Sequence, residues 1–234
     1  MAQYNNRRLM GNRSAKKSRI TRYEYQEFSS ISKFTEKEIK YLLLHFQSIS
    51  KLHHDDGVID YKEFLECLKL PDTLITQQIF KTIDLNGDNR INFREFILGL
   101  NFLMDEDQEC LSNLVFKIFD LMQEKSFGIT EMESVLLSSF KLFPGVKISQ
   151  ESLHAMLLRN LTEFRAEIHK KQKEVMLSRN SMAILKNIEP QLENLEAFRF
   201  DKESFHLYFK FHPLVFRMLS MSFELIKSNA KALS

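Results

Sequence analysis

The chain has 234 residues and a formal net charge of +2, and this length allows one large domain or two small ones. Hydrophobic residues make up 44% of it and Phe occurs 21 times, which is enough for a packed core. Six Gly, four Pro, no Trp and long helical periodicities favour an all-α fold over a β-rich one. No apolar run reaches 18 residues, so we expect no membrane-spanning helix. We also expect no secretory leader and no N-myristoylation, since the chain opens with Met-Ala-Gln.

The first segment, residues 1–29, is predicted to be a disordered basic tail. Residues 1–22 contain no acidic residue and seven basic ones: Arg7, Arg8, Arg13, Lys16, Lys17, Arg19 and Arg22. The rest of the chain, with 26 basic and 31 acidic residues, carries a net charge of −5. The tail is therefore either a solvated leader or an electrostatic tether to an acidic surface such as anionic lipid, nucleic acid or tubulin tails.

A first helix–loop–helix unit opens the N-terminal pair that we expect at residues 30–104. Counted back from Glu63 as position 12 of its loop, Gly57 falls at position 6 and Ile59 at position 8. Three carboxylates fall on ligand positions of such a loop: Asp56, Asp60 and Glu63. Positions 1 and 3, however, hold a leucine and a histidine, which bind calcium poorly. The loop is either a second calcium site, in an expanded form that begins at Ser50, or a scaffold for its neighbour.

The second loop carries the most informative pattern in the chain, because oxygen-bearing residues recur at positions 1, 3, 5, 9 and 12. The predicted calcium ligands are Asp84, Asn86, Asp88, the backbone carbonyl of Arg90, Asn92 and Glu95. Ile91 at position 8 is expected to pair with the first loop in a short ribbon. Asn89 replaces the usual glycine at position 6, and Asn is the non-glycine residue that best tolerates a positive φ. We expect a working calcium site.

The third unit begins the C-terminal pair, which we expect at residues 108–227. Taking Glu133 as position 12 places Met122, Glu124 and Ser126 at positions 1, 3 and 5. In that register Asp120 comes two residues too early, unless the loop is expanded, and Phe127 stands where glycine is preferred. The third loop is therefore predicted to have lost calcium while keeping its fold.

The fourth unit is interrupted. Its second half, Phe200–Phe205, follows an insertion of about 164–192, and Leu195, Ala197 and Ser204 replace three ligands. The insertion is charged and typical of a helix or helical hairpin, either solvated or acting as a docking arm. The apolar run that follows is expected to be the last helix of the unit plus a helix that caps the core. The alternatives are an exposed partner-binding segment and an intramolecular plug.

Several features bear on the class of function. The two cysteines, Cys67 and Cys110, lie in apolar helical runs and are predicted to be buried free thiols of a reducing compartment. The sequence contains no phosphate-binding glycine-rich loop, nucleophile elbow or His-Glu metalloprotease pair, so we expect that the protein is not an enzyme.

From Phe34 to about Leu142 the sequence resembles the EF-hand calcium sensors of the calcineurin B-like, calcineurin B and neuronal calcium sensor groups. The resemblance rests on Ser50 to Phe64 with its Asp-Asp-Gly-Val-Ile core, on Phe119-Asp120-Leu121 with Gly128-Ile129, and on Phe200–Phe205 followed by His212-Pro213-Leu214. It implies four EF-hand units in two pairs and Ca²⁺ as the cofactor. It also implies that calcium draws Glu95 inward and opens an apolar groove for an amphipathic helix of a protein partner.

The resemblance suggests that the groove is lined by Phe93, Phe96, Leu100 and Met104. Two functions remain open at this point. The first is a cytoplasmic calcium sensor that regulates its partner. The second is a structural adaptor bound permanently to a large assembly, such as the microtubules or dynein of a ciliary axoneme.

Overall fold

A computed structural model describes residues 21–52, 54, 56–104, 107–173, 188, 191–212 and 214–232. Helices dominate these residues, as the sequence predicts, and none of the described helices is both long and apolar enough to cross a bilayer. Most of the predicted tail lies at residues 1–20, outside the described residues. The elements of the N-terminal half are α1 (Arg22–Ile31), α2 (Glu36–Ile49), α3 (Tyr61–Leu68), α4 (Leu74–Ile83) and α5 (Phe93–Leu103).

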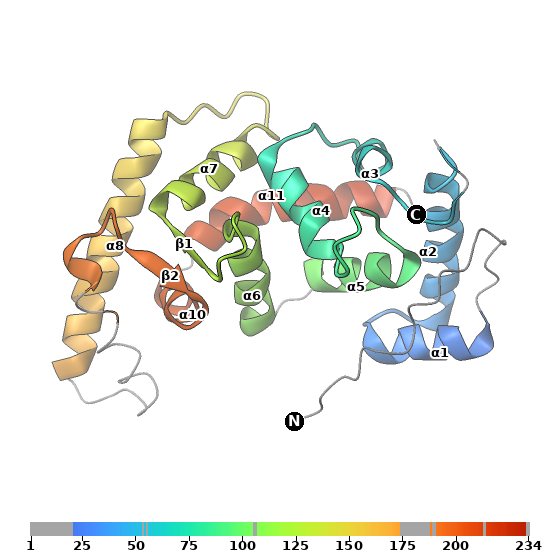
Figure 1. Cartoon of the computed structure of the whole chain (residues 1–234), viewed down its shortest axis with the longest axis horizontal. Coiled ribbons are helices and arrows are strands. Elements are labelled where there is room, and N and C mark those ends of the chain that lie inside the picture. The colour runs from blue at the N-terminus through green and yellow to red at the C-terminus, as the bar shows by residue number, and fades with distance from the viewer. Residues whose placement is uncertain are drawn as a thin grey trace.

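The C-terminal half continues the helix–loop–helix pattern. Its elements are α6 (Gln108–Phe119), β1 (Ser126–Gly128), α7 (Ile129–Phe140), α8 (Gln150–Lys173), η1 (Gln191–Glu193), β2 (Arg199–Asp201), α10 (Lys202–Phe211) and α11 (Leu214–Ala232). Figure 1 shows α1 to α5 on one side of the molecule and α6 to α10 on the other, with α11 running between them.

The loops of the first two units pair as predicted. Ile59 and Ile91 form an isolated antiparallel bridge, in which the N–H of each donates to the carbonyl of the other at 2.9 and 2.8 Å. Both side chains are buried in the core. This bridge joins the α2–α3 and α4–α5 units into one pair, because neither helix pair could bury its apolar face alone.

The last two units pair through a longer ribbon. Strands β1 and β2 are antiparallel, with Phe127 opposite Phe200 and Gly128 opposite Arg199. Both phenylalanines are buried, and their rings lie 5.5 Å apart. Phe205 of α10 packs on both rings, at 5.1 and 5.7 Å, so an aromatic cluster holds this pair together.

Helix α11 caps the core, as the sequence favours. Buried apolar side chains recur along it at Val215, Leu219, Phe223 and Ile226, a spacing that turns one face of the helix inward. It contacts α3 of the first pair and α7 of the second. Near its end, the side-chain amide of Asn229 donates to the carbonyl of Leu68 at 2.6 Å.

Two predicted boundaries are wrong. Residues 22–29 are not part of a disordered tail, because Thr21 and Glu24 form a capping box that starts α1, and Phe28 is buried. The predicted insertion of about 164–192 begins too early. Helix α8 runs without a break through Lys173, and its Phe164 and Ile168 side chains are buried in the core. Residues 174–187 and 189–190 of that insertion lie outside the described residues.

Candidate metal centre and apolar groove

The loop between α4 and α5 is organised around its first residue. Asp84 ends α4, and its two carboxylate oxygens accept hydrogen bonds from the backbone N–H groups of Gly87 at 2.9 Å and Asn89 at 2.8 Å. Both donors have a positive φ, 72° at Gly87 and 60° at Asn89. Asn89 therefore adopts the left-handed conformation expected at position 6, and its N–H fixes the first predicted ligand.

The next two predicted ligands are held in the same way. The Asn86 side-chain amide oxygen accepts from the N–H of Asp88 at 2.8 Å, and an Asp88 carboxylate oxygen accepts from the N–H of Arg90 at 2.9 Å. The Asn86 amide also donates to Asp88 at 3.1 Å. The loop backbone thus orients each of these side chains.

Glu95, the predicted closing ligand, is buried in the first turn of α5. One of its oxygens accepts from the N–H groups of Leu85 at 3.1 Å and Asn86 at 3.2 Å, and the other from the N–H of Asn92 at 3.0 Å. Burial raises the pKa of Glu95, the N–H donors of Asn92 and Asn86 oppose this, and the nearby carboxylates of Asp84 and Asp88 raise it further. Negative charge is concentrated here, and a divalent cation would offset it.

The donor set of this loop suits a hard cation such as calcium. Among the described residues, no group of three or more His, Cys, Asp or Glu side chains is close enough to hold a metal ion without other ligands. The loop would therefore need Asn86, Asn92 and the backbone carbonyl of Arg90 in addition to its three carboxylates. Asn92 caps α5 by accepting from the N–H of Glu95 at 3.1 Å, so it fits a ligand that acts through water.

The three carboxylates predicted as a second metal site have other partners. Asp56 contacts the guanidinium of Arg90 at 2.6 Å. Asp60 and Glu63 cap α3 reciprocally, since each accepts from the backbone N–H of the other. Gly57 has a φ of 76°, so the loop keeps the expected backbone turn. Asn92 and Glu95 make the same capping contacts in the second loop; what differs here is Leu52 and His54 at positions 1 and 3, so this loop fits a ribbon partner better than a second metal site.

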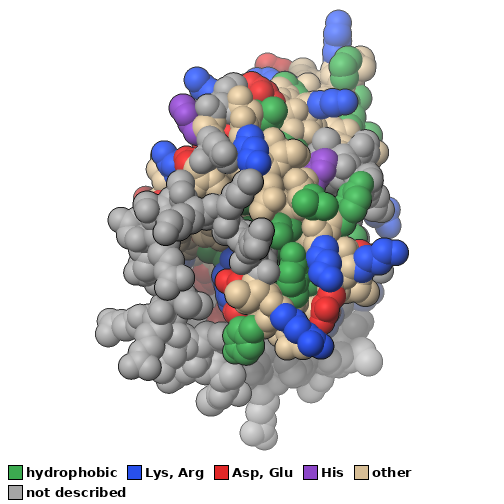
Figure 2. All heavy atoms as spheres, turned by 90° about the vertical axis from the view of Figure 1, so that its right-hand side faces the viewer, with side chains coloured by type: hydrophobic (Ala, Val, Ile, Leu, Met, Phe, Trp, Pro, Cys, Tyr) green, Lys and Arg blue, Asp and Glu red, His purple; other side chains and the backbone are tan. Residues whose placement is uncertain are grey.

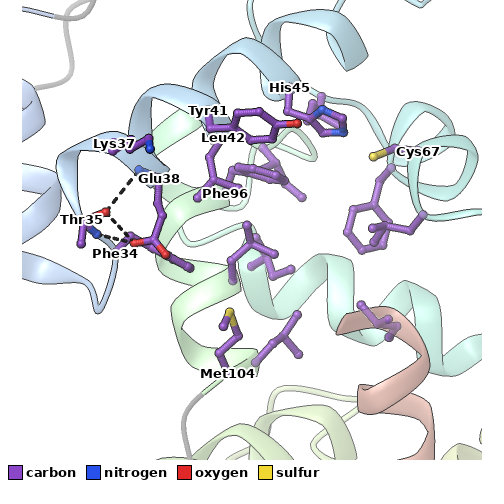
Figure 3. A pocket seen from close by; sticks show the side chains of 18 residues that line it. Phe34, Thr35, Lys37, Glu38, Tyr41, Leu42, His45, Cys67, Phe96 and Met104 are labelled. Carbon is purple, nitrogen blue, oxygen red and sulfur yellow. Dashed lines mark hydrogen bonds between the residues drawn. The ribbon is translucent and has the colours of Figure 1, made fainter. Parts of the chain in front are cut away.

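An apolar groove of about 620 Å³ opens between α2, α3 and α5. Figure 3 shows Tyr41, Leu42 and His45 of α2 on one side of it, Phe96 of α5 and its C-cap Met104 on another, and Cys67 of α3 beyond. Leu100 and Leu103 of α5 complete that wall, and Ile226 of α11 lines one end.

Three of the four residues predicted to line the groove do so: Phe96, Leu100 and Met104. Phe93 does not line it. Its ring packs between Phe28 of α1 and Phe46 of α2, at 5.4 Å from each. Because α1 was expected to be unfolded, no sequence pattern indicated that Phe93 would be covered. Figure 2 shows hydrophobic side chains exposed between Lys and Arg on the side of the molecule that carries α1 and α2; the exposed ones on these helices are Tyr23, Tyr41 and Leu44.

No protein-family model matches the chain. It is 28% identical to a calcineurin B protein of Naegleria gruberi over 141 residues, which cover 60% of this chain and 76% of that protein. It is 24% identical to a type 2 calcineurin B protein of Dictyostelium discoideum over 63% of this chain and 78% of that one. The chain is an EF-hand protein. Both matches extend over most of the relative, so the similarity to calcineurin B is not confined to a single helix–loop–helix unit.

Two further relatives bear on the interpretation of this EF-hand protein. The calcium-binding protein NCSA of Dictyostelium discoideum is 28% identical over 53% of this chain and 66% of its own length. Lysophosphatidylcholine acyltransferase 2 of Danio rerio is 36% identical over 84 residues, but these cover only 16% of that protein. The match to an enzyme is therefore confined to a small part of it.

The structure corrects the register of the third EF-hand loop. Gly128 and Glu131, not residues two positions later, occupy the helix-capping positions 9 and 12 that Asn92 and Glu95 occupy in the second loop. Position 1 is therefore Asp120, whose carboxylate oxygens accept from the N–H groups of Glu124 and Lys125 at 3.0 Å each.

The residue at position 6 of this corrected register is Lys125, with a φ of 60°, the same value as Asn89. Phe127 falls at position 8 and pairs with Phe200 in the ribbon. The register predicted for the fourth loop is right, because Asp201 and Ser204 cap α10 at positions 9 and 12. Ser204 at position 12 has no carboxylate, and the loss of calcium from this loop stays a prediction.

Proposed function

We propose that this EF-hand protein binds Ca²⁺ in the loop from Asp84 to Glu95 and regulates a protein partner through its apolar groove. The names of its relatives, calcineurin B and a calcium-binding protein, support a regulatory rather than a catalytic role. The observation that carries the proposal is that Glu95 and the groove-lining residues Phe96, Leu100 and Met104 lie along α5 and its C-terminal cap.

Helix α5 connects the candidate calcium loop to the apolar groove. Ca²⁺ would supply the positive charge that the crowded carboxylates of Asp84, Asp88 and Glu95 lack. Glu95, which accepts hydrogen bonds from the backbone N–H groups of Leu85 and Asn86, would be one of the residues that hold the ion. Any resulting rotation of α5 moves Phe96 and Leu100 in the groove wall, because helices move as rigid units.

The shape and chemistry of the groove favour one amphipathic helix as its occupant. Its walls are mostly apolar, which suits anchors at i, i+3, i+4 and i+7 of a partner helix. His45 adds a polar feature: burial lowers its pKa, and its Nε2 has no hydrogen-bond partner among the described residues. A neutral imidazole there would pair with one polar group of the partner.

Retention on a phenyl resin tests the proposal. The full chain is loaded in calcium and eluted with chelator, and we expect calcium-dependent retention. Leu100→Lys in the groove should abolish retention, whereas Leu44→Lys, at an exposed position of α2 outside the groove lining, should not. Equal retention of the wild type in calcium and in chelator would refute regulation by calcium.

A second candidate is a structural adaptor that stays bound to a large assembly, such as axonemal microtubules or dynein. One observation supports it. Of the four loops, only the second has a full set of calcium ligands in its sequence, so much of the molecule would not respond to calcium. The basic residues of segment 1–22 would attach to acidic lipid or tubulin tails. Co-purification with one complex in both chelator and high salt would favour the adaptor and a ciliary location over a cytoplasmic sensor.

A further inference from the structure

The guanidinium of Arg199 makes an unusual set of contacts. Arg199 begins β2 at position 7 of the fourth loop, yet its nitrogens reach across the ribbon into the third loop. Nη1 donates to Glu131 at 3.0 Å, and Nη2 donates to the backbone carbonyl of Ser126 at 2.9 Å and to Glu124 at 3.3 Å. Nε donates to the Ser126 hydroxyl at 3.2 Å.

The acceptors of these bonds are not arbitrary. In the corrected register Glu124, Ser126 and Glu131 occupy positions 5, 7 and 12, which supply a side-chain oxygen, a backbone carbonyl and the closing carboxylate to calcium in an intact EF-hand loop. One cationic group therefore contacts three of the positions at which the second loop presents Asp88, the Arg90 carbonyl and Glu95.

We propose that Arg199 is the resident cation of the third EF-hand loop and replaces calcium there. The loop is then held in a folded form whatever the calcium concentration. This inference concerns the third loop alone and does not depend on calcium binding between residues 84 and 95.

The ribbon delivers the guanidinium to this place. Arg199 lies directly opposite Gly128 in the antiparallel register, next to the buried pair of Phe127 and Phe200. A planar guanidinium with several donors suits two carboxylates and a carbonyl better than an ammonium group does. At Glu131, burial raises the pKa, but hydrogen bonds from the N–H groups of Glu131 and Gly128 and the contact with Arg199 lower it overall.

The backbone of the third loop retains the form of a metal-binding loop. Asp120 is bound by two loop N–H groups, as Asp84 is in the second loop. Gln123 and Lys125 have positive φ angles of 57° and 60°, at the positions where Gly87 and Asn89 have 72° and 60°. Non-glycine residues adopt this conformation at a cost, so a stabilising contact inside the loop is required.

The N-terminal pair contains a partial version of the same arrangement. Arg90 also stands at position 7 of the second loop of its pair, and it contacts Asp56, at position 5 of the first loop. The two pairs thus share an arginine that reaches from one loop to position 5 of the other. Arg199 differs because it also binds the carbonyl at position 7 and the carboxylate at position 12.

The test uses the full chain carrying Glu95→Gln, which weakens the calcium response of the second loop, and compares each variant with Glu95→Gln alone. Adding Arg199→Ala should lower the melting temperature in chelator by about 3 °C, the shift expected for a loss of roughly 1 kcal/mol in a chain of this size. Without the guanidinium, Glu124 and Glu131 lose their cationic partner and become free, beside Asp120, to bind calcium. Calcium at 10 mM should therefore raise the melting temperature of this double variant by more than it raises that of Glu95→Gln alone, by about the 3 °C that was lost.

Two further variants complete the experiment. Arg159→Ala removes the exposed pair of Arg159 with Glu163 on α8 and should change neither value, because such pairs contribute little. Arg199→Lys keeps the positive charge but lacks the planar guanidinium with its several donors. Its melting temperature in chelator should lie between those of Arg199 and Arg199→Ala, and it provides a result if Arg199→Ala does not fold. An unchanged melting temperature in chelator would overturn the proposal. So would a loss that calcium fails to restore, because Arg199 would then be an ordinary ion pair.

Discussion

Gly99 of α5 and Ile83 of α4 touch so closely that no side chain fits between them. A Cβ at residue 99 would lie 2.7 Å from two carbons of the Ile83 side chain. Ile83 directly precedes Asp84, the first predicted calcium ligand, and Gly99 lies one turn beyond Glu95, the last. The helices that flank the candidate metal loop are therefore packed against each other, the last residue of α4 against the middle of α5.

Gly99→Ala should destabilise the protein, although alanine is normally the better helix residue. The helix gains about 0.5–1 kcal/mol from replacing an interior glycine. Overpacking against Ile83 costs about 1–3 kcal/mol, since the clashing carbons are close to the Ile83 backbone and cannot swing away. Urea unfolding in chelator should show a net loss in the free energy of unfolding of about 1–2 kcal/mol.

The same substitution in an Ile83→Ala background is the control for this explanation. With the clashing carbons removed, Gly99→Ala should stabilise that variant by about 0.5–1 kcal/mol. If Gly99→Ala destabilises both backgrounds equally, the contact with Ile83 is not the reason for the glycine.

Glu95→Gln should weaken calcium binding by about 10- to 100-fold. Glu95 is the buried carboxylate of the loop, and a contact to a charged group contributes about 1.5–3 kcal/mol, which converts to this factor. Isothermal titration calorimetry of the full chain measures it directly. The matched control is Glu203→Gln, an exposed first-turn glutamate of α10, which should leave the affinity unchanged. Calcium affinity that survives Glu95→Gln would place the main site in another loop.

The all-α fold, the pairing of Ile59 with Ile91 and the arrangement of the second loop were predictable from sequence. These features depend on short-range patterns: apolar periodicity, a capping box and a twelve-residue spacing of oxygen ligands. The structure adds that Asn89 does adopt a positive φ and that both Asp84 oxygens are held by loop N–H groups. The identity of the bound ion and its ligands stays a prediction.

The register of the third loop was not predictable in the same way. Glu131 and Glu133 lie two residues apart at the start of the same helix-forming segment, so sequence spacing alone does not decide which closes the loop. The decision comes from the backbone, because Gly128 and Glu131 cap α7 and Lys125 takes the positive φ that glycine usually adopts. The contacts of Arg199 could not be predicted from sequence spacing either, because they join residues that lie 68 to 75 positions apart in the chain.

The two misplaced boundaries share a physical cause. Arg22 and the charged residues of α8 made both segments look solvated, yet each helix buries a narrow apolar stripe. In α1 the stripe is Phe28 alone, whereas in α8 the stripe of Leu153, Leu157 and Leu161 continues through Phe164 and Ile168 among charged neighbours. In such segments tertiary contacts rather than propensity decide where a helix begins and ends.

Asn89 offers a separate test of the second loop. Because its φ is 60° and its N–H holds Asp84, a residue that resists the left-handed conformation should displace that ligand. Asn89→Val should weaken calcium binding by about 10-fold, from a conformational cost of about 1–2 kcal/mol. Asn89→Gly should bind as tightly as the wild type or slightly more tightly. If calorimetry gives Asn89→Val and Asn89→Gly the same calcium affinity, the backbone conformation of residue 89 does not determine calcium binding by the loop.

Cys67 should be an unreactive thiol in the folded protein. Burial in the core beside the groove raises its pKa to about 12, because the thiolate is poorly solvated there. Relative to a free cysteine, whose pKa is about 8.5, the thiolate fraction at pH 8 falls by roughly 10³-fold. Alkylation by iodoacetamide at pH 8, followed by mass spectrometry of the Cys67 peptide, should be slowed by about that factor.

The same pKa shift has a consequence for stability. A thiol with a raised pKa in the folded state favours folding below the pKa of the unfolded chain, and this contribution is lost as the pH rises from about 8.5 toward 12. Cys67→Ala should therefore flatten the fall in stability over this pH range. The chain unfolded in urea is the control for the alkylation rate, because Cys67 should react there as a free thiol. Fast alkylation of Cys67 in the folded chain would mean that the groove opens to solvent far more often than its packing indicates.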